Sequence, residues 1–295
     1  MKIATWNVNS IRTRLNHVVN WLQENPVDIL CLQETKVIDD GFPKEPFTNL
    51  GYQSYISGQK SYNGVAILSR TALSDVSTGF AAILGDRAIN LDEQKRVITG
   101  IADGIRIVNL YVPNGSSVGS DKYLYKLRWL EALREYLKEI GSRVRNPKDE
   151  GTEDAGTRGN GDVGTLEPIQ TSESKVQNLQ SLLICGDFNI ALEDIDIHDP
   201  TGREKMVMAT DLERQALQAV LELGLADGFR KFTAEGGQFS WWDYRQAAFR
   251  RNLGWRIDHI YLSPDLYERS IACTIDVTPR KLEQPSDHVP VILEL

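Results

Sequence analysis

The feature that most constrains the fold is a series of short apolar runs that recurs along the whole chain. The runs cover residues 2–8, 28–34, 64–70, 97–103, 105–112, 181–188, 239–244, 257–263, 271–277 and 289–295. Runs of this length, rich in Val, Ile and aromatic residues and bounded by polar or turn-forming residues, are typical of β-strands. About ten strands are enough for two sheets.

Helical patterns lie between some of these runs. Apolar residues recur with helical spacing over 14–24, where Pro26 follows, over 123–140, and over 211–224, which ends at Gly224. Strands that alternate with helices in some places and follow one another directly in others favour two packed sheets with helices outside. We therefore expect an α/β fold of four layers, a sandwich of two packed mixed β-sheets flanked by helices.

Residues 146–180 have a different composition from the rest of the chain. They are rich in Gly, Thr, Asp and Glu, and they hold seven acidic and three basic residues, which places four of the eight net negative charges here. Such a segment cannot bury enough apolar surface to order itself. It could link two domains. We favour an acidic surface insert within a single domain over 1–295, because strands on both sides must join one sheet for the motifs below to converge.

The net charge of −8 argues against a polyanionic substrate, since proteins that bind nucleic acid usually carry a surplus of Lys and Arg. Binding depends on the local field rather than on the average, and a metal ion held by acidic residues adds positive charge where they cluster. The acidic balance therefore weakens a nucleic-acid interpretation without excluding it.

The sequence also predicts where the protein works. It begins without a basic segment followed by an apolar run, and no stretch approaches about 18 uninterrupted apolar residues, so we expect neither secretion nor a membrane span. Cys31, Cys185 and Cys273 each lie in an apolar segment, which predicts buried thiols in a reducing cytosol. We expect a cytoplasmic protein, associated with the nucleoid if the source is bacterial.

Polar side chains follow several predicted strands, where a rigid scaffold can present them to solvent. Taken singly, Asn7 would be a turn residue, Glu34 a solvated strand end and Asn189 a helix cap. As a set they offer carboxylate and amide oxygens without cysteine, which fits magnesium or manganese and not zinc. The strand-end residues are Asn7, Asn9, Glu34, Asp187, Asn189, Asp258, Asp287 and His288.

His288 is one of only four histidines, and a lone histidine is usually structural or exposed. Its neighbour Asp287, and Asp258 in another strand-end motif, indicate a function. An imidazole oriented by a carboxylate can keep its charged form near neutral pH, and an imidazolium suits the oxygens of a phosphoryl group.

Seven short blocks carry a resemblance to a known family. They are WNVNSIR at 6–12, LQETK at 32–36, YVPNG at 111–115, GDFNI at 186–190, SWWDYR at 240–245, GWRIDH at 254–259 and SDHVPV at 286–291. In order and local context the blocks resemble the signature motifs of the exonuclease III family of abasic-site endonucleases, in the endonuclease/exonuclease/phosphatase superfamily. The resemblance covers nearly the whole chain except 146–180.

The resemblance implies a magnesium site, in which manganese can substitute. Glu34 would be the principal ligand. The metal-site positions that it implies are Asn7, Glu34, Asp187, Asn189, Asp287 and His288.

The resemblance also implies catalytic roles. Asp187 would orient or deprotonate the attacking water, and Asn189 and His288 would donate to the phosphoryl oxygens. Asp258 would hold His288 in place. Tyr111 would meet the phosphate or the departing 3′ oxygen, although from its pattern alone it could be a core residue of a strand.

Two further sets of residues are implied for substrate binding. Trp241, Trp255 and Ile257 match the pocket that accepts a flipped-out abasic sugar, although tryptophans in strands are more often plain core. The implied DNA contacts are Arg12, Lys36, Tyr62, Asn114 and Arg245. The chain departs from some relatives after YVPN, where GSSVGSDK at 115–122 contains no arginine, so we expect a weaker or different grip on the far side of the DNA.

The implied activity is incision of duplex DNA 5′ to an abasic site, with 3′→5′ exodeoxyribonuclease and 3′-end-cleaning activity, by a monomer. One alternative is another enzyme of the superfamily, such as a phosphatase of inositol phosphates or sphingomyelin or an RNA deadenylase. The LQETK, SWWDYR and GWRIDH blocks favour DNA repair over these. The other alternative is a non-catalytic DNA-binding relative, but no metal or phosphate position of the pattern is altered.

Overall fold

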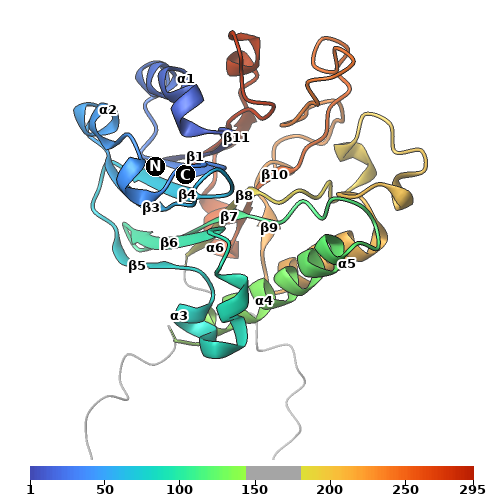
Figure 1. Ribbon diagram of the computed structural model, residues 1–295, viewed down its shortest axis with the longest axis horizontal. Coiled ribbons are helices and arrows are strands. Elements are labelled where there is room, and N and C mark those ends of the chain that lie inside the picture. The colour runs from blue at the N-terminus through green and yellow to red at the C-terminus, as the bar shows by residue number, and fades with distance from the viewer. Residues whose placement is uncertain (144–180) are drawn as a thin grey trace, which may run out of the picture.

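The computed structural model describes residues 1–143 and 181–295, and it folds them into two six-stranded sheets that pack against each other (Figure 1). The first sheet runs in the order β11 (Ala272–Ile275), β12 (Val291–Glu294), β1 (Lys2–Asn7), β2 (Ile29–Gln33), β4 (Val65–Ser69), β3 (Gln53–Ser57). The second runs β5 (Ser74–Thr78), β6 (Val97–Ala102), β7 (Ile105–Tyr111), β8 (Leu182–Asp187), β10 (Asp258–Leu262), β9 (Ala226–Asp227).

Both sheets are mixed. In each, one pair of neighbouring strands is parallel, β1 with β2 and β7 with β8, and the other pairs are antiparallel. The parallel strands need crossover connections, and helices α1 (Ile11–Glu24) and α4 (Asp121–Arg143) supply the helical part of these. The expected sandwich of two mixed sheets is confirmed.

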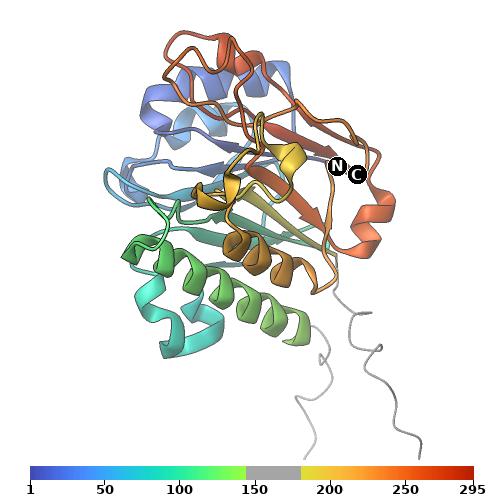
Figure 2. The same cartoon turned by 90° about the vertical axis from the view of Figure 1, so that its right-hand side faces the viewer.

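Helices cover the outer face of each sheet. Apolar side chains of α1 and α2 pack on β1, β2 and β4, whereas those of α3, α4 and α5 pack on β7 and β8. Figure 2 shows α1 and α4 on opposite sides of the two sheets. The helices are α1 (Ile11–Glu24), α2 (Lys44–Asn49), α3 (Ala81–Leu84), α4 (Asp121–Arg143), α5 (Asp211–Leu221) and α6 (Pro264–Arg269), with short 3₁₀ turns at Asp39–Gly41, Gly85–Leu91, Asp194–Asp196, Arg203–Lys205 and Thr278–Lys281.

A third apolar cluster fills the space between the sheets. Ile3 and Cys31 of one sheet meet Ile107, Cys185 and Ile260 of the other there. The three cysteines are free and buried, as expected. Among the described residues no helix is both long and apolar enough to cross a membrane.

One predicted strand was wrong. The run 239–244 forms no strand, because Trp241 makes only isolated bridges to Trp255 and His288. Its two tryptophans pack into separate clusters, so the run is buried without a continuous partner strand. Strands β3, β5 and β9 carried too few apolar residues to be predicted, and β5 is largely exposed at a sheet edge. The predicted insert at 146–180 lies outside the described residues.

Candidate active site

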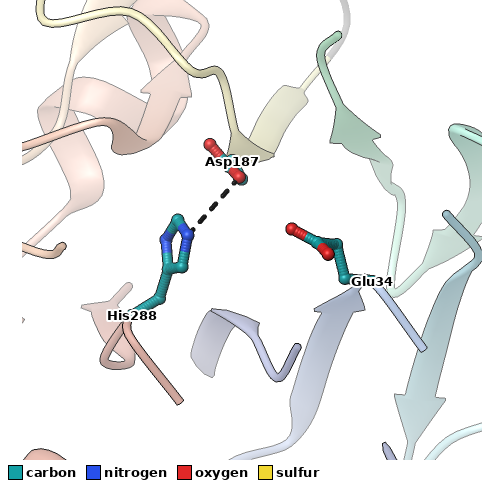
Figure 3. Close-up of side chains that lie close together, drawn as sticks. All are labelled: Glu34, Asp187 and His288. Atoms are coloured by element: carbon teal, nitrogen blue, oxygen red, sulfur yellow. Dashed lines mark ion pairs between the residues drawn. The ribbon is translucent and has the colours of Figure 1, made fainter. Parts of the chain in front are cut away.

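Residues from both sheets and from the segment before β12 meet at one edge of the sandwich. Glu34 follows β2, Asp187 ends β8, and His288 lies in the loop that leads to β12. Each offers one ligand atom, and these atoms lie within 4.8 Å of one another. Figure 3 shows the three side chains pointing toward a common centre.

Several residues at this edge have an unusual backbone conformation. Asn9, Glu34, Lys36 and Asn189 have positive φ angles of 43°, 50°, 55° and 51°, a region that side-chain-bearing residues enter at a cost. Residues in such conformations cluster at functional sites because the surrounding structure has to hold them there.

His288 is held between two carboxylates. Its Nδ1 lies 2.8 Å from Oδ2 of Asp258, and its Nε2 lies 3.7 Å from Oδ2 of Asp187. Burial alone would lower the pKa of His288, but Asp258 and Asp187 outweigh it and raise the pKa above its usual value. The imidazole is therefore charged at neutral pH, with Nε2 on the side of Asp187 and Glu34.

Asp187 is fully buried and accepts three hydrogen bonds from amide groups. The backbone N–H of Asn189 donates to Oδ1 at 2.8 Å, and Asn7 Nδ2 and Asn189 Nδ2 donate to Oδ2 at 2.9 and 3.1 Å. Burial nevertheless raises the pKa of Asp187, and His288 opposes this rise. A carboxylate with a raised pKa is a better base than one in water.

Lys36 is turned toward the site instead of standing on the open surface. Its Nζ lies 2.8 Å from Oε2 of Glu34 and donates to Oδ1 of Asn9 at 2.5 Å. Burial raises the pKa of Glu34, but Lys36 and Asn7 outweigh it and lower the pKa overall. In this structure, therefore, the Lys36 ammonium is the cation that neutralises Glu34.

Asp287 and the amide oxygens of Asn7 and Asn189 accept hydrogen bonds from residues outside the group of Glu34, Asp187 and His288. Asp287 accepts hydrogen bonds from Asn9 Nδ2 at 2.9 Å and Trp241 Nε1 at 3.1 Å, so the structure does not bring it into the group of Glu34, Asp187 and His288. Asn7 uses Oδ1 to accept the N–H of Asn9 and Nδ2 to bridge Glu34 and Asp187. The family resemblance was the signal for Asp287, but its carboxylate does not point with His288 toward Glu34 and Asp187.

Tyr111, Tyr62 and Asn114 line one cavity of about 470 Å³ beside the site. Burial and the nearby Glu34 raise the pKa of Tyr111 well above its usual value, so the phenol keeps its proton. Asn114 Nδ2 donates to Oδ1 of Asn189 at 2.9 Å. No sequence motif pointed to Arg96, whose guanidinium stacks 4.5 Å from the Tyr111 ring centroid and donates to the Tyr111 carbonyl at 3.0 Å.

A second cavity, of about 490 Å³, is lined by Trp241, Trp255 and Arg245 among others. The two indole rings meet edge to face, with centroids 6.5 Å apart. Ile257 packs in the same apolar cluster but is 1% exposed and lies behind the wall. Arg245 is exposed and pairs with Asp243 at 2.7 Å, and Arg12 is exposed on α1. The predicted pocket tryptophans are therefore brought together, and Ile257 supports them.

The group of Glu34, Asp187 and His288 can hold a metal ion. Two carboxylates and one imidazole, with amide oxygens nearby, are ligands that divalent cations accept. No cysteine belongs to the group, and the three cysteines lie buried in the strands.

Known nucleases and a known phosphatase resemble this chain over its whole length. The model of the Endonuclease/Exonuclease/phosphatase family matches residues 4–288. Exodeoxyribonuclease III of Haemophilus influenzae is 31% identical, over 100% of this chain and 99% of that protein. Among solved structures, the 3′ phosphatase NExo of Neisseria bound to a product DNA hairpin has a TM-score of 0.83 and 38% identity, over 100% of this chain and 99% of that one. An AP endonuclease from Archaeoglobus fulgidus has a TM-score of 0.81 and 38% identity, with the same coverage.

Proposed function

Because the chain belongs to the endonuclease/exonuclease/phosphatase family, and within it to the exonuclease III group, we propose that it is a DNA-repair nuclease that hydrolyses phosphodiester bonds. The reaction that we propose is incision of duplex DNA 5′ to an abasic site, leaving a 3′-hydroxyl and a 5′-deoxyribose phosphate. The same site would remove nucleotides and blocking groups from 3′ ends. Relatives named for exonuclease, abasic-endonuclease and 3′-phosphatase activities support both reactions.

The observation that carries the proposal is the arrangement of Glu34, Asp187 and His288, with Asp258 behind the histidine. Hydrolysis of a phosphodiester needs a base for the water and positive charge for the phosphoryl oxygens. Asp187 is a buried carboxylate with a raised pKa, and His288 is a cation 3.7 Å away. The two groups can therefore serve the two needs at one phosphate, Asp187 toward the water and His288 toward a phosphoryl oxygen.

The metal that we propose is Mg²⁺, with Mn²⁺ as a substitute. Glu34 would be the principal ligand, and Asp187 and His288 share its group in this structure, whereas Asn7, Asn189 and Asp287 would have to turn to contribute. A bound divalent ion supplies positive charge that stabilises negative charge on the phosphate. Lys36 pairs with Glu34 here and would give up that contact to an ion.

The chain's own groups would share the remaining work. Asp187 would orient or deprotonate the water, and His288 would donate from Nε2 to a phosphoryl oxygen. Tyr111, which keeps its proton, would lie near the departing oxygen. Asn189 donates to Asp187 and to the carbonyl of Val112 in this structure, so its proposed donation to the substrate requires its amide to turn.

The substrate that we propose is double-stranded DNA with abasic sites or blocked 3′ ends, bound by a monomer. Trp241 and Trp255, backed by Ile257, would form the wall that an abasic sugar meets. The DNA backbone would be contacted by Arg12, Tyr62, Asn114, Arg245 and, once an ion replaces its contact with Glu34, by Lys36. The free buried thiols support a cytoplasmic location, at the nucleoid if the source is bacterial.

A single set of assays tests the function. A labelled duplex with one abasic analogue is compared with an undamaged duplex, a 3′-phosphate end, an RNA tail and an inositol polyphosphate, each with magnesium and with EDTA. We expect magnesium-dependent cutting immediately 5′ to the lesion and processing of the 3′ end. Phosphate release from the inositol compound or shortening of RNA, without DNA cleavage, would assign the protein to another branch. Silence on all substrates would favour a binding role.

A further inference from the structure

A buried lysine lies directly behind the candidate active site. Lys126 of α4 is the only lysine among the described residues that is fully buried. Its Nζ donates to the backbone carbonyl of Asn189 at 2.7 Å, to that of Asn114 at 3.3 Å, and to Oε1 of Glu213 at 2.5 Å. An ammonium has three N–H donors, and each donor of Lys126 therefore has one acceptor.

A fully buried charge is costly unless it is both paired and hydrogen-bonded. Lys126 meets both conditions, and two of its three acceptors belong to loops that form the site. Asn114 lies in the loop after β7 and Asn189 in the loop after β8, and the side chains of the two asparagines are themselves joined at 2.9 Å. One ammonium thus ties together the two loops whose side chains face the proposed phosphate.

The fold makes room for this contact. Gly115 has a φ of 94°, and a Cβ there would lie 3.3 Å from Cδ of Lys126 and 3.1 Å from a methyl group of Val207. On the other side, Glu213 accepts the N–H groups of Met208 and Thr210 at 3.0 and 3.1 Å and belongs to the capping box of α5. The ion pair therefore joins α4, α5 and both loops.

We propose that Lys126 is a positioning residue for the hydrolysis, acting by holding the Asn189 carbonyl so that the Asn189 N–H and amide reach Asp187. Asn189 has a φ of 51°, a conformation that needs external support. Its N–H and Nδ2 make two of the hydrogen bonds that orient the Asp187 carboxylate. Loss of the ammonium would let this peptide relax and would move the carboxylate. This inference rests on the proposed function.

The decisive variant is K126M combined with E213Q, because removing only the lysine would leave a buried unpaired carboxylate and could unfold the protein. The amide that replaces the Glu213 carboxylate keeps an acceptor oxygen for the cap of α5. We expect single-turnover cleavage of the abasic duplex to slow by about tenfold or more, since small displacements of catalytic groups have large effects. Duplex affinity should stay within about twofold.

E213Q alone separates the ion pair from the contact with the loops. This variant keeps the ammonium and its two carbonyl acceptors, but the ammonium loses its charged partner and one amide oxygen replaces two carboxylate oxygens. Its cost should therefore fall on stability, and we expect the cleavage rate to drop less than about threefold. A loss as large as that of the double variant would assign the effect to Glu213 and overturn the role of Lys126.

K231M is the matched control. Lys231 also donates to backbone carbonyls, those of Tyr267, Glu268 and Ser270, but they lie at the end of α6, outside the site. K231M should lower stability and leave the cleavage rate unchanged. A merely structural Lys126 would make the two variants behave alike.

Amide hydrogen exchange of Asn189 gives a readout that does not depend on substrate. We expect faster exchange of this N–H in K126M/E213Q and not in K231M. Normal cleavage together with unchanged exchange in the double variant would overturn the inference. If the wild-type protein cleaves no substrate, the proposed function fails, and the exchange measurement by itself then decides whether Lys126 positions Asn189.

Discussion

Asp187 shows how one residue can be buried and still be kept ready for proton transfer. It has no solvent exposure, yet amide donors from Asn7 and Asn189 surround its oxygens. The donors fix the orientation of the carboxylate, while burial keeps its pKa above the usual value. Because the charged His288 lies beside it, one small site holds both a base, Asp187, and an acid, His288.

Removing either central carboxylate should abolish most of the activity. We expect E34A or D187N to slow cleavage of an abasic duplex at least about a hundredfold, which corresponds to about 2.7 kcal/mol of barrier. Folding should change little, because both groups serve the substrate more than the core. Steady-state kinetics with magnesium measure the loss, and D265N, on α6 outside the site, is the control. Wild-type rates in either variant would show that the site is assigned wrongly.

Asp258 should control the charge of His288. Burial lowers the pKa of this imidazole, whereas Asp258 is the largest influence that raises it. In D258N the burial penalty remains and the main compensation is lost, so the pKa should fall, and less imidazolium should be present at neutral pH. NMR titration of the His288 ring in the metal-free protein measures the shift directly. A pKa that stays raised in D258N would contradict this account of the pair.

The identities of the site residues could be predicted from sequence, but their directions could not. Glu34, Asp187 and His288 stood at strand ends within motifs, and these ends do meet. Lys36 and Asp287 stood in equally clear motifs and point to Glu34 and Trp241 instead. The direction of Asp287 depends on Asn9 and Trp241, which are distant in sequence, and that of Lys36 depends on the positive φ angles at positions 34 and 36. No local pattern encodes either.

At the scale of elements, the segment 254–258 is fixed by a buried ion cluster. Arg256 is 1% exposed and lies between Trp255 and Ile257. It makes two bonds to the Asp196 carboxylate, at 2.7 and 3.0 Å, and pairs with Asp227 at 2.8 Å. The short turn that contains Asp196 thereby holds the wall of the proposed abasic pocket from behind.

D196N should therefore destabilise the protein in a way that depends on pH. Breaking a buried pair by removing one partner costs about 3–5 kcal/mol. Burial raises the pKa of Asp196, but Arg256 and its neighbours outweigh it and lower the pKa below its usual value. A carboxyl group with a lowered native pKa stabilises the fold above its unfolded pKa and loses this effect as pH falls through the native value.

Urea unfolding of wild type and D196N at several pH values checks this prediction. The difference in the free energy of unfolding should be constant from neutral pH down to about pH 5 and shrink only below about pH 4. The exposed variant D211N, which loses a surface pair with Arg203, should differ little from wild type. A D196N effect that disappears between about pH 6 and pH 8 would mean that a histidine, and not this carboxyl group, is responsible.

Elements were predictable where burial alone determines them. Strands β1, β2, β4 and β8 are buried along nearly their whole length, and their continuous apolar runs were visible in the sequence. The mostly polar edge strand β5 could not be predicted from the sequence, because its strand conformation depends on pairing with β6. The run 239–244 was wrongly predicted to be a strand, because aromatic residues can be buried in loops as well as in strands.

At the scale of the whole molecule, the site depends on how the two sheets sit on each other. Glu34 follows a strand of one sheet and Asp187 ends a strand of the other, and Asn7 bonds to both. Close by, Gln33 Nε2 donates to Asn109 Oδ1 at 2.7 Å across the interface. Apolar packing alone would let the sheets slide, whereas these buried hydrogen bonds fix one register. No pattern along the chain could reveal this cross-sheet contact.

The acidic segment 146–180 is the part of the chain that we expect the reaction not to need. It lies outside the described residues, between α4, which ends at Arg143, and β8, which begins at Leu182. All the proposed catalytic, metal-binding and DNA-contacting residues lie in the rest of the chain. The segment also carries four of the eight net negative charges, which repel a polyanion at low ionic strength.

Replacing 146–180 with a short Gly/Ser linker should leave single-turnover cleavage of the abasic duplex within about twofold of wild type. Duplex affinity should rise slightly at low salt, because negative charge has been removed, and the gain should vanish as salt screens it. Stopped-flow cleavage and fluorescence anisotropy at two salt concentrations separate the two effects. A variant with the same linker length that keeps the seven acidic residues tests whether charge alone causes the change in affinity. Loss of folding in the linker variant would show instead that the segment contributes to the domain, and the interpretation of 146–180 as a surface insert would be wrong.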